Sequence, residues 1–201
     1  MTTKNTKEDS DIDTVKIMHI SILRLDHRLP RDERITTHVA LVARAFGAQE
    51  IMYTGQHDTG LEQSVLRLVK QWGGEFTIQY EKQYKKILEN YKEKKYKIIH
   101  LTMYGLPLLE VIEAHFAKTS YERLLIIIGG PHVPGVVFTM ADFNVAVTNQ
   151  PHSEVAALAL FLNQLQNNEP LKRAYDLRFK TGKMKIEPTE RGKKLTMNDS
   201  L

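Results

Sequence analysis

The sequence contains no cysteine, and no apolar run in it reaches the length of a membrane-spanning helix. Without cysteine the chain can form no disulfide framework, thiolate metal site, iron–sulfur cluster or thiol nucleophile. An apolar run such as Leu124–Ile128 has strand length, far below the roughly 20 residues needed to cross a bilayer. Residues 1–14 are polar and lack the apolar stretch of a signal peptide. We therefore expect a soluble cytoplasmic protein with no membrane partner.

The chain also lacks a strong charge imbalance, except near its C-terminal end. Residues 167–201 carry nine of the 28 basic and five of the 24 acidic side chains, so residues 1–166 carry 19 of each. A basic extension on a neutral body is a modest indication of nucleic-acid contact, although a solvated tail has the same composition. We expect a leader over 1–14, one domain over 15–166 and a basic extension over 167–201.

Short apolar runs alternate with stretches of helical periodicity along residues 15–166. Strands are predicted at Lys16–Leu25, Glu50–Thr54, Glu75–Tyr80, Lys97–Met103, Leu124–Ile128 and Asn144–Val147. Helices are predicted at Thr37–Phe46 with Thr36 as its cap, Leu61–Trp72, Gln83–Tyr96, Pro107–Phe116 and His152–Leu165. This alternation predicts an α/β fold with a parallel sheet covered by helices on both faces. Ligands of such sheets bind at the carboxyl ends of the strands.

The loop after the first predicted strand is rich in arginine. Residues 24–34, RLDHRLPRDER, hold four arginines, three acids and one histidine. The planar guanidinium suits phosphate or carboxylate, and the acids can hold the arginines in place through ion pairs. A solvated loop with internal salt bridges is the alternative for most of these residues.

Glycine and proline dominate the loop after the fifth predicted strand, GGPHVPG at residues 129–135. It matches neither GxGxxG nor GxxxxGK[ST], which disfavours dinucleotide and nucleoside-triphosphate cradles. A ligand that contacts main-chain groups, such as the nucleoside of S-adenosylmethionine, fits better, although a tight structural turn would look similar.

The sixth predicted strand is followed by TNQPHSEVAALA at residues 148–159. Asn149 or Ser153 can cap the following helix, and its free N–H groups suit the carboxylate of an amino-acid-like ligand. Glu154 favours the same positive helix end. His100 is expected inside a strand, whereas His132 and His152 lie in the candidate loops without metal-ligand spacing, so we expect no metal. No G-x-S-x-G elbow supports a hydrolase.

Four segments together resemble the archaeal tRNA (cytidine-2'-O-)methyltransferases of the SPOUT class: RLDHRLPRDERITTHVALVARAFGA, HLTMYGLP, GGPHVP and DFNVAVTNQPHSEVAALALFL. The resemblance spans about Lys16 to Leu165, with an echo at residues 191–194. It implies a C-terminal deep trefoil knot, bound S-adenosylmethionine, a homodimer with active sites near the subunit interface, and methylation of the ribose of cytidine 56 in the tRNA T-loop. True knots are otherwise almost absent from proteins, so patterning alone would not predict one.

The resemblance also assigns residues to roles. Cofactor contacts are implied for Leu101, Gly130, Pro131, His132, Val133, Pro134, Thr148, Asn149, Gln150, Pro151, His152, Ser153, Glu154 and Val155. For the chemistry our candidates are Arg28 and Arg34, with His38 and Asp32 behind them. An arginine can stabilise negative charge on the 2'-oxygen or hold the neighbouring phosphate. Where the best-known SPOUT ribose methyltransferases have a motif arginine before AFG, this chain has Leu41, so that role is not carried over.

Five basic residues of the extension are candidate phosphate contacts: Lys183, Lys185, Arg191, Lys193 and Lys194. Such contacts make binding salt-dependent without selecting a base. Two other functions stay open at this stage: a SPOUT methyltransferase acting on another RNA such as rRNA, and a non-catalytic RNA-binding module.

Overall fold

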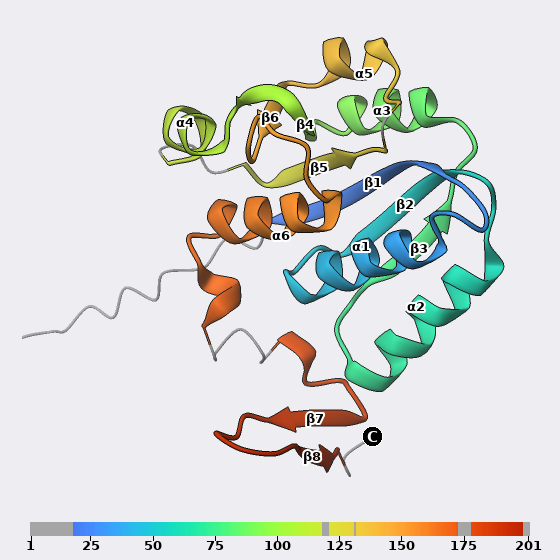
Figure 1. Ribbon diagram of the computed structural model, residues 1–201, viewed down its shortest axis with the longest axis vertical. Coiled ribbons are helices and arrows are strands. Elements are labelled where there is room, and N and C mark those ends of the chain that lie inside the picture. Colours follow the sequence, from blue (N-terminus) through green and yellow to red (C-terminus); the bar gives the residue numbers. More distant parts are fainter. Residues whose placement is uncertain (1–17, 118–120, 131, 173–177, 199–201) are drawn as a thin grey trace, which may run out of the picture.

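A computed structural model describes residues 18–117, 121–130, 132–172 and 178–198. Its centre is a six-stranded, wholly parallel sheet in the order β3-β2-β1-β5-β4-β6 (Figure 1). The strands are β1 His19–His27, β2 Glu50–Gly55, β3 Thr77–Tyr80, β4 Lys97–Pro107, β5 Arg123–Ile128 and β6 Phe143–Ala146. The predicted α/β fold with a parallel sheet is confirmed. No helix in the described part of the chain is long and apolar enough to cross a membrane.

Helices cover both faces of the sheet. They are α1 Glu33–Ala45, α2 Thr59–Trp72, α3 Tyr84–Glu93, α4 Leu108–Val111 with a π-helical turn Ile112–Phe116, α5 Gly135–Met140 and α6 Glu154–Leu165. Because successive side chains of a strand point to opposite faces of the sheet, the buried strands form two hydrophobic cores, one on each face. Ile20 and Ile22 of β1 face α1, α2 and α6, whereas Leu23 and Leu25 face α3 and α5.

The exit of β4 makes an unusual path around β6. Leu101 pairs with Val145, the register then shifts, and Leu106 pairs with the same Val145. The chain between Leu101 and Leu106 therefore bulges out of the sheet beside the end of β6. Bulges of this kind redirect a strand where a site or an edge requires it.

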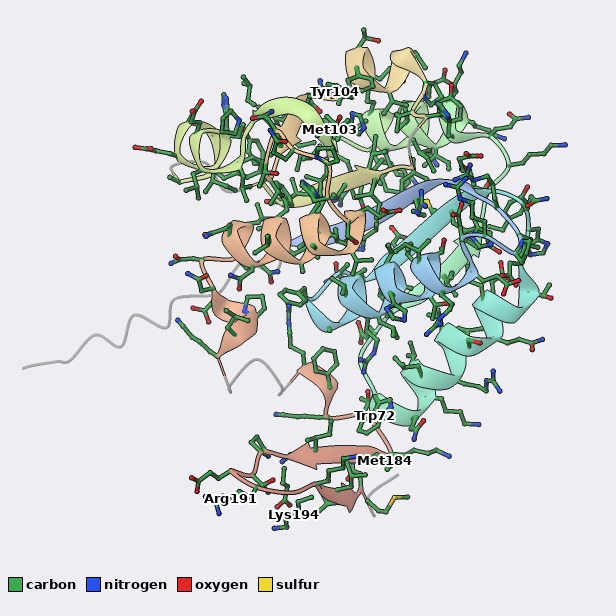
Figure 2. The ribbon with its side chains drawn as sticks, in the orientation of Figure 1. Trp72, Met103, Tyr104, Met184, Arg191 and Lys194 are labelled. Atoms are coloured by element: carbon green, nitrogen blue, oxygen red, sulfur yellow. The ribbon has the colours of Figure 1, made fainter. Side chains whose placement is uncertain are left out.

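The basic extension contains an antiparallel hairpin, β7 Met184–Glu187 and β8 Lys194–Met197. It lies against the C-terminal end of α2, and Trp72 and Met184 lie near each other in Figure 2. Arg44 of α1 donates to the carbonyl of Gly73 and stacks at 4.6 Å on the Phe179 ring. Arg44 of α1 thereby joins the C-terminal end of α2 to the segment that leads into the hairpin.

Several predicted boundaries were wrong. Helix α1 begins after Asp32, not Thr36, because the Thr36 hydroxyl is buried against His27 inside the helix. The third helix stops at Glu93 because Lys95 adopts a left-handed conformation. Helix α5 and the hairpin were not predicted, and the first residues of the first predicted strand, 16–17, lie outside the described part of the chain.

Candidate active site

Four loops meet at one edge of the sheet. They follow β1, β4, β5 and β6, which are neighbours in the order β1-β5-β4-β6. Because all six strands are parallel, their carboxyl ends lie at the same edge. The arginine-rich loop and the two candidate cofactor loops are thus brought together, as the sequence indicated.

Arg24 connects β1 to the N-terminal end of α6. Its side chain is 1% exposed, and its Nη2 lies 3.0 Å from Glu154 Oε1, while Nη1 donates to the Leu25 carbonyl. Burial lowers the pKa of Arg24, and the Glu154 charge opposes that shift. Its Nε has no hydrogen-bond partner in the described part of the chain. A buried guanidinium thus ties one predicted cofactor residue to the central strand.

Arg28 faces the glycine-rich loop from the end of β1. Its Nε lies 3.0 Å from Asp32 Oδ2 and 3.7 Å from Asp26 Oδ2, and the bond to Asp32 raises the pKa of Arg28. Burial raises the pKa of Asp32, but the hydrogen bond and charge of Arg28 outweigh it, so that pKa is lowered. A Cβ added to Gly130 would lie 3.7 Å from Arg28 Nη2. Asp26 and Asp32 therefore hold the Nε of Arg28 in place. Its terminal nitrogens are free of these acids and lie close to Gly130.

The glycine-rich loop runs from the end of β5 into α5. A Cβ on Gly129 would lie 2.4 Å from Val133 Cγ2, so the loop closes tightly on itself. His132 and Pro134 are exposed, and Pro134 directly precedes the first residue of α5. Pro131 lies outside the described residues. In the described part of this loop, a ligand can form polar contacts with main-chain groups and with the His132 ring.

The loop after β6 packs on the bulge of β4. Asn149 Nδ2 donates to the carbonyls of Met103 (2.8 Å) and Gly105 (3.1 Å). Ser153 caps α6 by accepting from Val155 N at 3.2 Å, which confirms one of the two predicted caps. The exposed residues of this loop are Thr148, Asn149, Gln150, Pro151, His152 and Ser153. Leu101 is 7% exposed and belongs to the core, so only its main chain is available to a ligand.

Gly105 is a point of close approach between β4 and β6. A Cβ there would lie 2.5 Å from the Asn144 carbonyl and from Val145 N. We expect Gly105→Ala to lower the free energy of unfolding by about 1–2 kcal/mol, because overpacking against backbone cannot be relieved by a rotamer change. Urea unfolding measures this, with Gly135→Ala as the control, since a Cβ at Gly135 would meet no atom of the described residues within 4 Å. Equal effects of the two substitutions would contradict the close approach.

His27 is buried between the arginine loop and α2. Its Nδ1 lies 2.9 Å from Thr36 Oγ1, its Nε2 lies 3.4 Å from Asp58 Oδ2, and its ring packs edge-on against Tyr53. Burial lowers the pKa of His27 below 6.5, and Asp58 opposes this shift. His100, predicted to lie within a strand, is likewise fully buried, and burial lowers its pKa too.

These two histidines predict an acid-sensitive fold. When the folded-state pKa lies below the unfolded value of 6.5, the unfolded chain binds more protons. The free energy of unfolding should therefore be greatest above pH 6.5 and should fall as the pH drops below it. Urea titrations between pH 5 and 8 measure this, and His27→Gln should flatten part of the slope. A free energy that rises towards pH 5 would be incompatible with neutral buried imidazoles.

Arg34 and His38 lie apart from Arg28 and Asp32. Both are exposed on α1, and they line a hollow between α1 and α2 that also includes Asp58. The four predicted catalytic residues thus form two pairs, one beside the Gly130 loop and one on the outer surface. Helical geometry causes this division, since Thr36, two residues after Arg34, points inward to His27.

The basic residues of the extension all lie on or beside the hairpin and are exposed: Lys183, Lys185, Arg191, Lys193 and Lys194. Arg191 and Lys194 are at its outer end in Figure 2. Lys194 pairs with Glu187 across the two strands.

The sequence predictions missed the roles of Arg24 and His27 at the site. Both were noted only as members of the arginine-rich loop. The signal was present, because Arg24 interrupts an apolar strand and therefore predicts a buried partner, but nothing in the sequence indicates that the partner is Glu154.

Comparisons with known proteins identify the family. The profile of the family described as tRNA ribose 2'-O-methyltransferase, aTrm56, matches residues 72–196. A Methanosphaera stadtmanae protein is 46% identical over 90% of this chain and 99% of its own, and a Thermococcus kodakarensis protein is 48% identical over 88% and 96%. Both are named tRNA (cytidine(56)-2'-O)-methyltransferase.

Solved structures share the fold at low sequence identity. The Aquifex aeolicus TrmH/SpoU tRNA modifying enzyme superposes with a TM-score of 0.57 at 12% identity, covering 82% of each chain. The SpoU methyltransferase AviRb of Streptomyces viridochromogenes, crystallised with AdoMet, gives 0.57 at 14% identity, covering 84% of this chain and 64% of its own. These likenesses show a TrmH/SpoU-type fold.

Proposed function

Because the chain belongs to the tRNA ribose 2'-O-methyltransferase family, we propose that it methylates the 2'-oxygen of cytidine 56 in the T-loop of tRNA. The observation that carries this proposal is the convergence of Arg28 with the loops after β5 and β6 at one sheet edge. We further propose that 15–166 form the methyltransferase unit and 167–201 an RNA-contacting extension.

S-adenosylmethionine is the methyl donor that suits these loops. A Cβ added to Gly130 would make ordinary contacts with Arg28 Nη2 at 3.7 Å and Arg24 Nη1 at 3.9 Å, and glycine, which has no side chain, lets a nucleoside approach its main chain closely. The N-terminal end of α6 offers N–H groups for a carboxylate, together with the polar groups of 148–153. When bound, the donor supplies an electrophilic methyl group. The chain need only hold it and align the acceptor.

Arg28 orients the acceptor ribose. Asp32 and Asp26 hold its Nε, so the terminal nitrogens are fixed rather than mobile. They can stabilise negative charge developing on the 2'-oxygen, or hold the phosphate beside it. Asp32 acts through Arg28 as a positioning residue. Alignment of the 2'-oxygen with the methyl group is the larger contribution, because it converts an encounter into a single step.

Two further features belong to this proposal: a homodimer and a C-terminal trefoil knot. Exposed apolar side chains on β4, α4 and α6 support a subunit contact there: Tyr104, Leu106, Leu109 and Leu160. In a dimer, Arg34 and His38 can serve the partner's active site rather than their own. The knot would involve the segment of β4 between Leu101 and Leu106, which bulges beside the end of β6.

The experiment is transfer of labelled methyl from S-adenosylmethionine to unmodified tRNA, mapped by nucleotide. We expect one product at position 56 and none when that nucleotide is 2'-deoxy. Methylation that survives the 2'-deoxy change would exclude ribose as the acceptor. Transfer to rRNA but not tRNA would identify the other SPOUT activity, and tRNA binding without donor binding would identify a non-catalytic module.

A further inference from the structure

The outward face of α2 carries a basic stripe. Gln63, Arg67 and Lys70 are exposed at the i, i+4, i+7 spacing that aligns side chains on one face. The acid of this helix, Glu62, is turned away, with its Oε1 2.9 Å from the Tyr53 hydroxyl and 3.2 Å from His57 Nε2. Residues 63–74 contain no acidic side chain. The exposed surface of α2 after its first turn therefore carries positive charge and no acid, beside the exposed side chain of Leu66.

This stripe borders a continuous depression. A hollow of about 520 Å³ lies between α1 and α2, and an adjoining open hollow of about 380 Å³ shares Gln63 and Arg67 with it. The charged side chains that line it are Glu33, Arg34, Asp58, Arg67 and Lys70.

Most of the charge in the depression is free to meet an anion. Arg67 donates to Ser64 Oγ at 3.3 Å, and no ion pair within the described part of the chain involves Arg34, Arg67 or Lys70. Of the two acids, Asp58 already accepts from Leu61 N and faces His27, which leaves Glu33 at the exposed rim. The local balance is positive.

The depression lies between the two regions of the proposed function. One end adjoins the start of α1, directly after the arginine loop, and α2 then runs about 21 Å to the hairpin (Figure 1). There Gln71 Nε2 lies 3.0 Å from Met184 Sδ, and Gly74 N donates to Thr181 Oγ1 at 3.1 Å. The hairpin and its lysines are thus held at the end of the stripe.

We propose that the α2 side of this depression, formed by Gln63, Arg67 and Lys70, binds the sugar–phosphate backbone of the tRNA. The proposal rests on the proposed function and adds a contact surface between the active site and the hairpin. Guanidinium forks suit phosphate oxygens, and an extended row of unpaired positive charge suits an extended polyanion. Contacts of this kind set the position of the RNA without reading its bases.

The test is a double variant, Arg67→Ala with Lys70→Ala, measured for tRNA affinity over a salt series. We expect affinity to fall about fivefold at physiological salt. The slope of log affinity against log salt should shrink by about 1.4–1.8, which is the value for two phosphate contacts. The affinity for S-adenosylmethionine and the turnover at saturating tRNA should be unchanged.

Lys85→Ala with Lys86→Ala on α3 is the matched control. That helix packs on the opposite face of the sheet, so removing two exposed charges there should leave the salt slope unchanged. If the salt slope of the α2 variant is unchanged while the wild type methylates tRNA normally, the depression does not bind the tRNA backbone. The proposed function would be unaffected by that result. A changed sedimentation coefficient with an unchanged slope would also overturn the proposed role of the depression, since the face would then join two subunits. If the wild type neither binds nor methylates tRNA, both the proposed function and the proposed role of the depression are wrong.

Discussion

Replacing Arg28 by alanine is expected to slow methyl transfer to tRNA by about 100- to 1000-fold while leaving S-adenosylmethionine affinity nearly unchanged. Removing one fixed donor that faces developing negative charge costs about this much in enzymes of other classes. Arg28 is suited to this role because Asp32 and Asp26 fix its Nε and its terminal nitrogens face Gly130. Single-turnover kinetics with labelled donor give the rate constant, and calorimetry gives the donor affinity.

Two further variants distinguish a loss of the chemical step from a loss of folded structure. Arg28→Lys keeps the charge but loses the fork, so we expect a rate between wild type and alanine. Arg34→Ala should also lower turnover with little effect on donor binding. If Arg28→Ala abolished donor binding, or left the rate within twofold of wild type, the role assigned to Arg28 would be wrong.

Replacing Glu154 by alanine is expected to lower the free energy of unfolding by about 3 kcal/mol and to weaken donor binding. The change leaves the Arg24 charge buried, with the Leu25 carbonyl as its remaining described acceptor. Breaking a buried ion pair from one side costs about 3–5 kcal/mol, and we expect the lower end because Glu154 is 25% exposed. Denaturant unfolding measures the change.

A double-mutant cycle isolates the pair. Arg24→Met combined with Glu154→Ala should recover much of the lost stability, because the stranded charge is removed together with its partner. Glu93→Ala on α3 serves as an exposed control and should change stability by less than about 0.5 kcal/mol. Strict additivity of the two single changes would show that the 3.0 Å contact contributes nothing.

The sequence predicted the sheet well and the ends of its elements less well. Alternating apolar runs are sufficient for six parallel strands, because both faces of such a sheet are buried. Helix α5 was missed since its six residues, GVVFTM, are as apolar as a strand. The hairpin was missed because its strands, MKIE and KLTM, are only four residues long and each carries charged residues.

The candidate site was predictable as a set of loops but not as a set of contacts. Strand polarity alone places Gly130, Thr148 and Arg28 at one edge. Which arginine faces the glycine loop depends on the rotation of α1, which separates Arg34 from Arg28. The Arg24–Glu154 pair joins residues from opposite ends of the domain, and no local pattern indicates such a contact.

The most direct measurement is a crystal structure of this chain with S-adenosylmethionine bound. The proposal predicts the donor held by main-chain groups of the loops after β5 and β6, with its methyl group directed towards the end of β1 that carries Arg28. A donor found in the hollow between α1 and α2, or touching only one of the two loops, would contradict it.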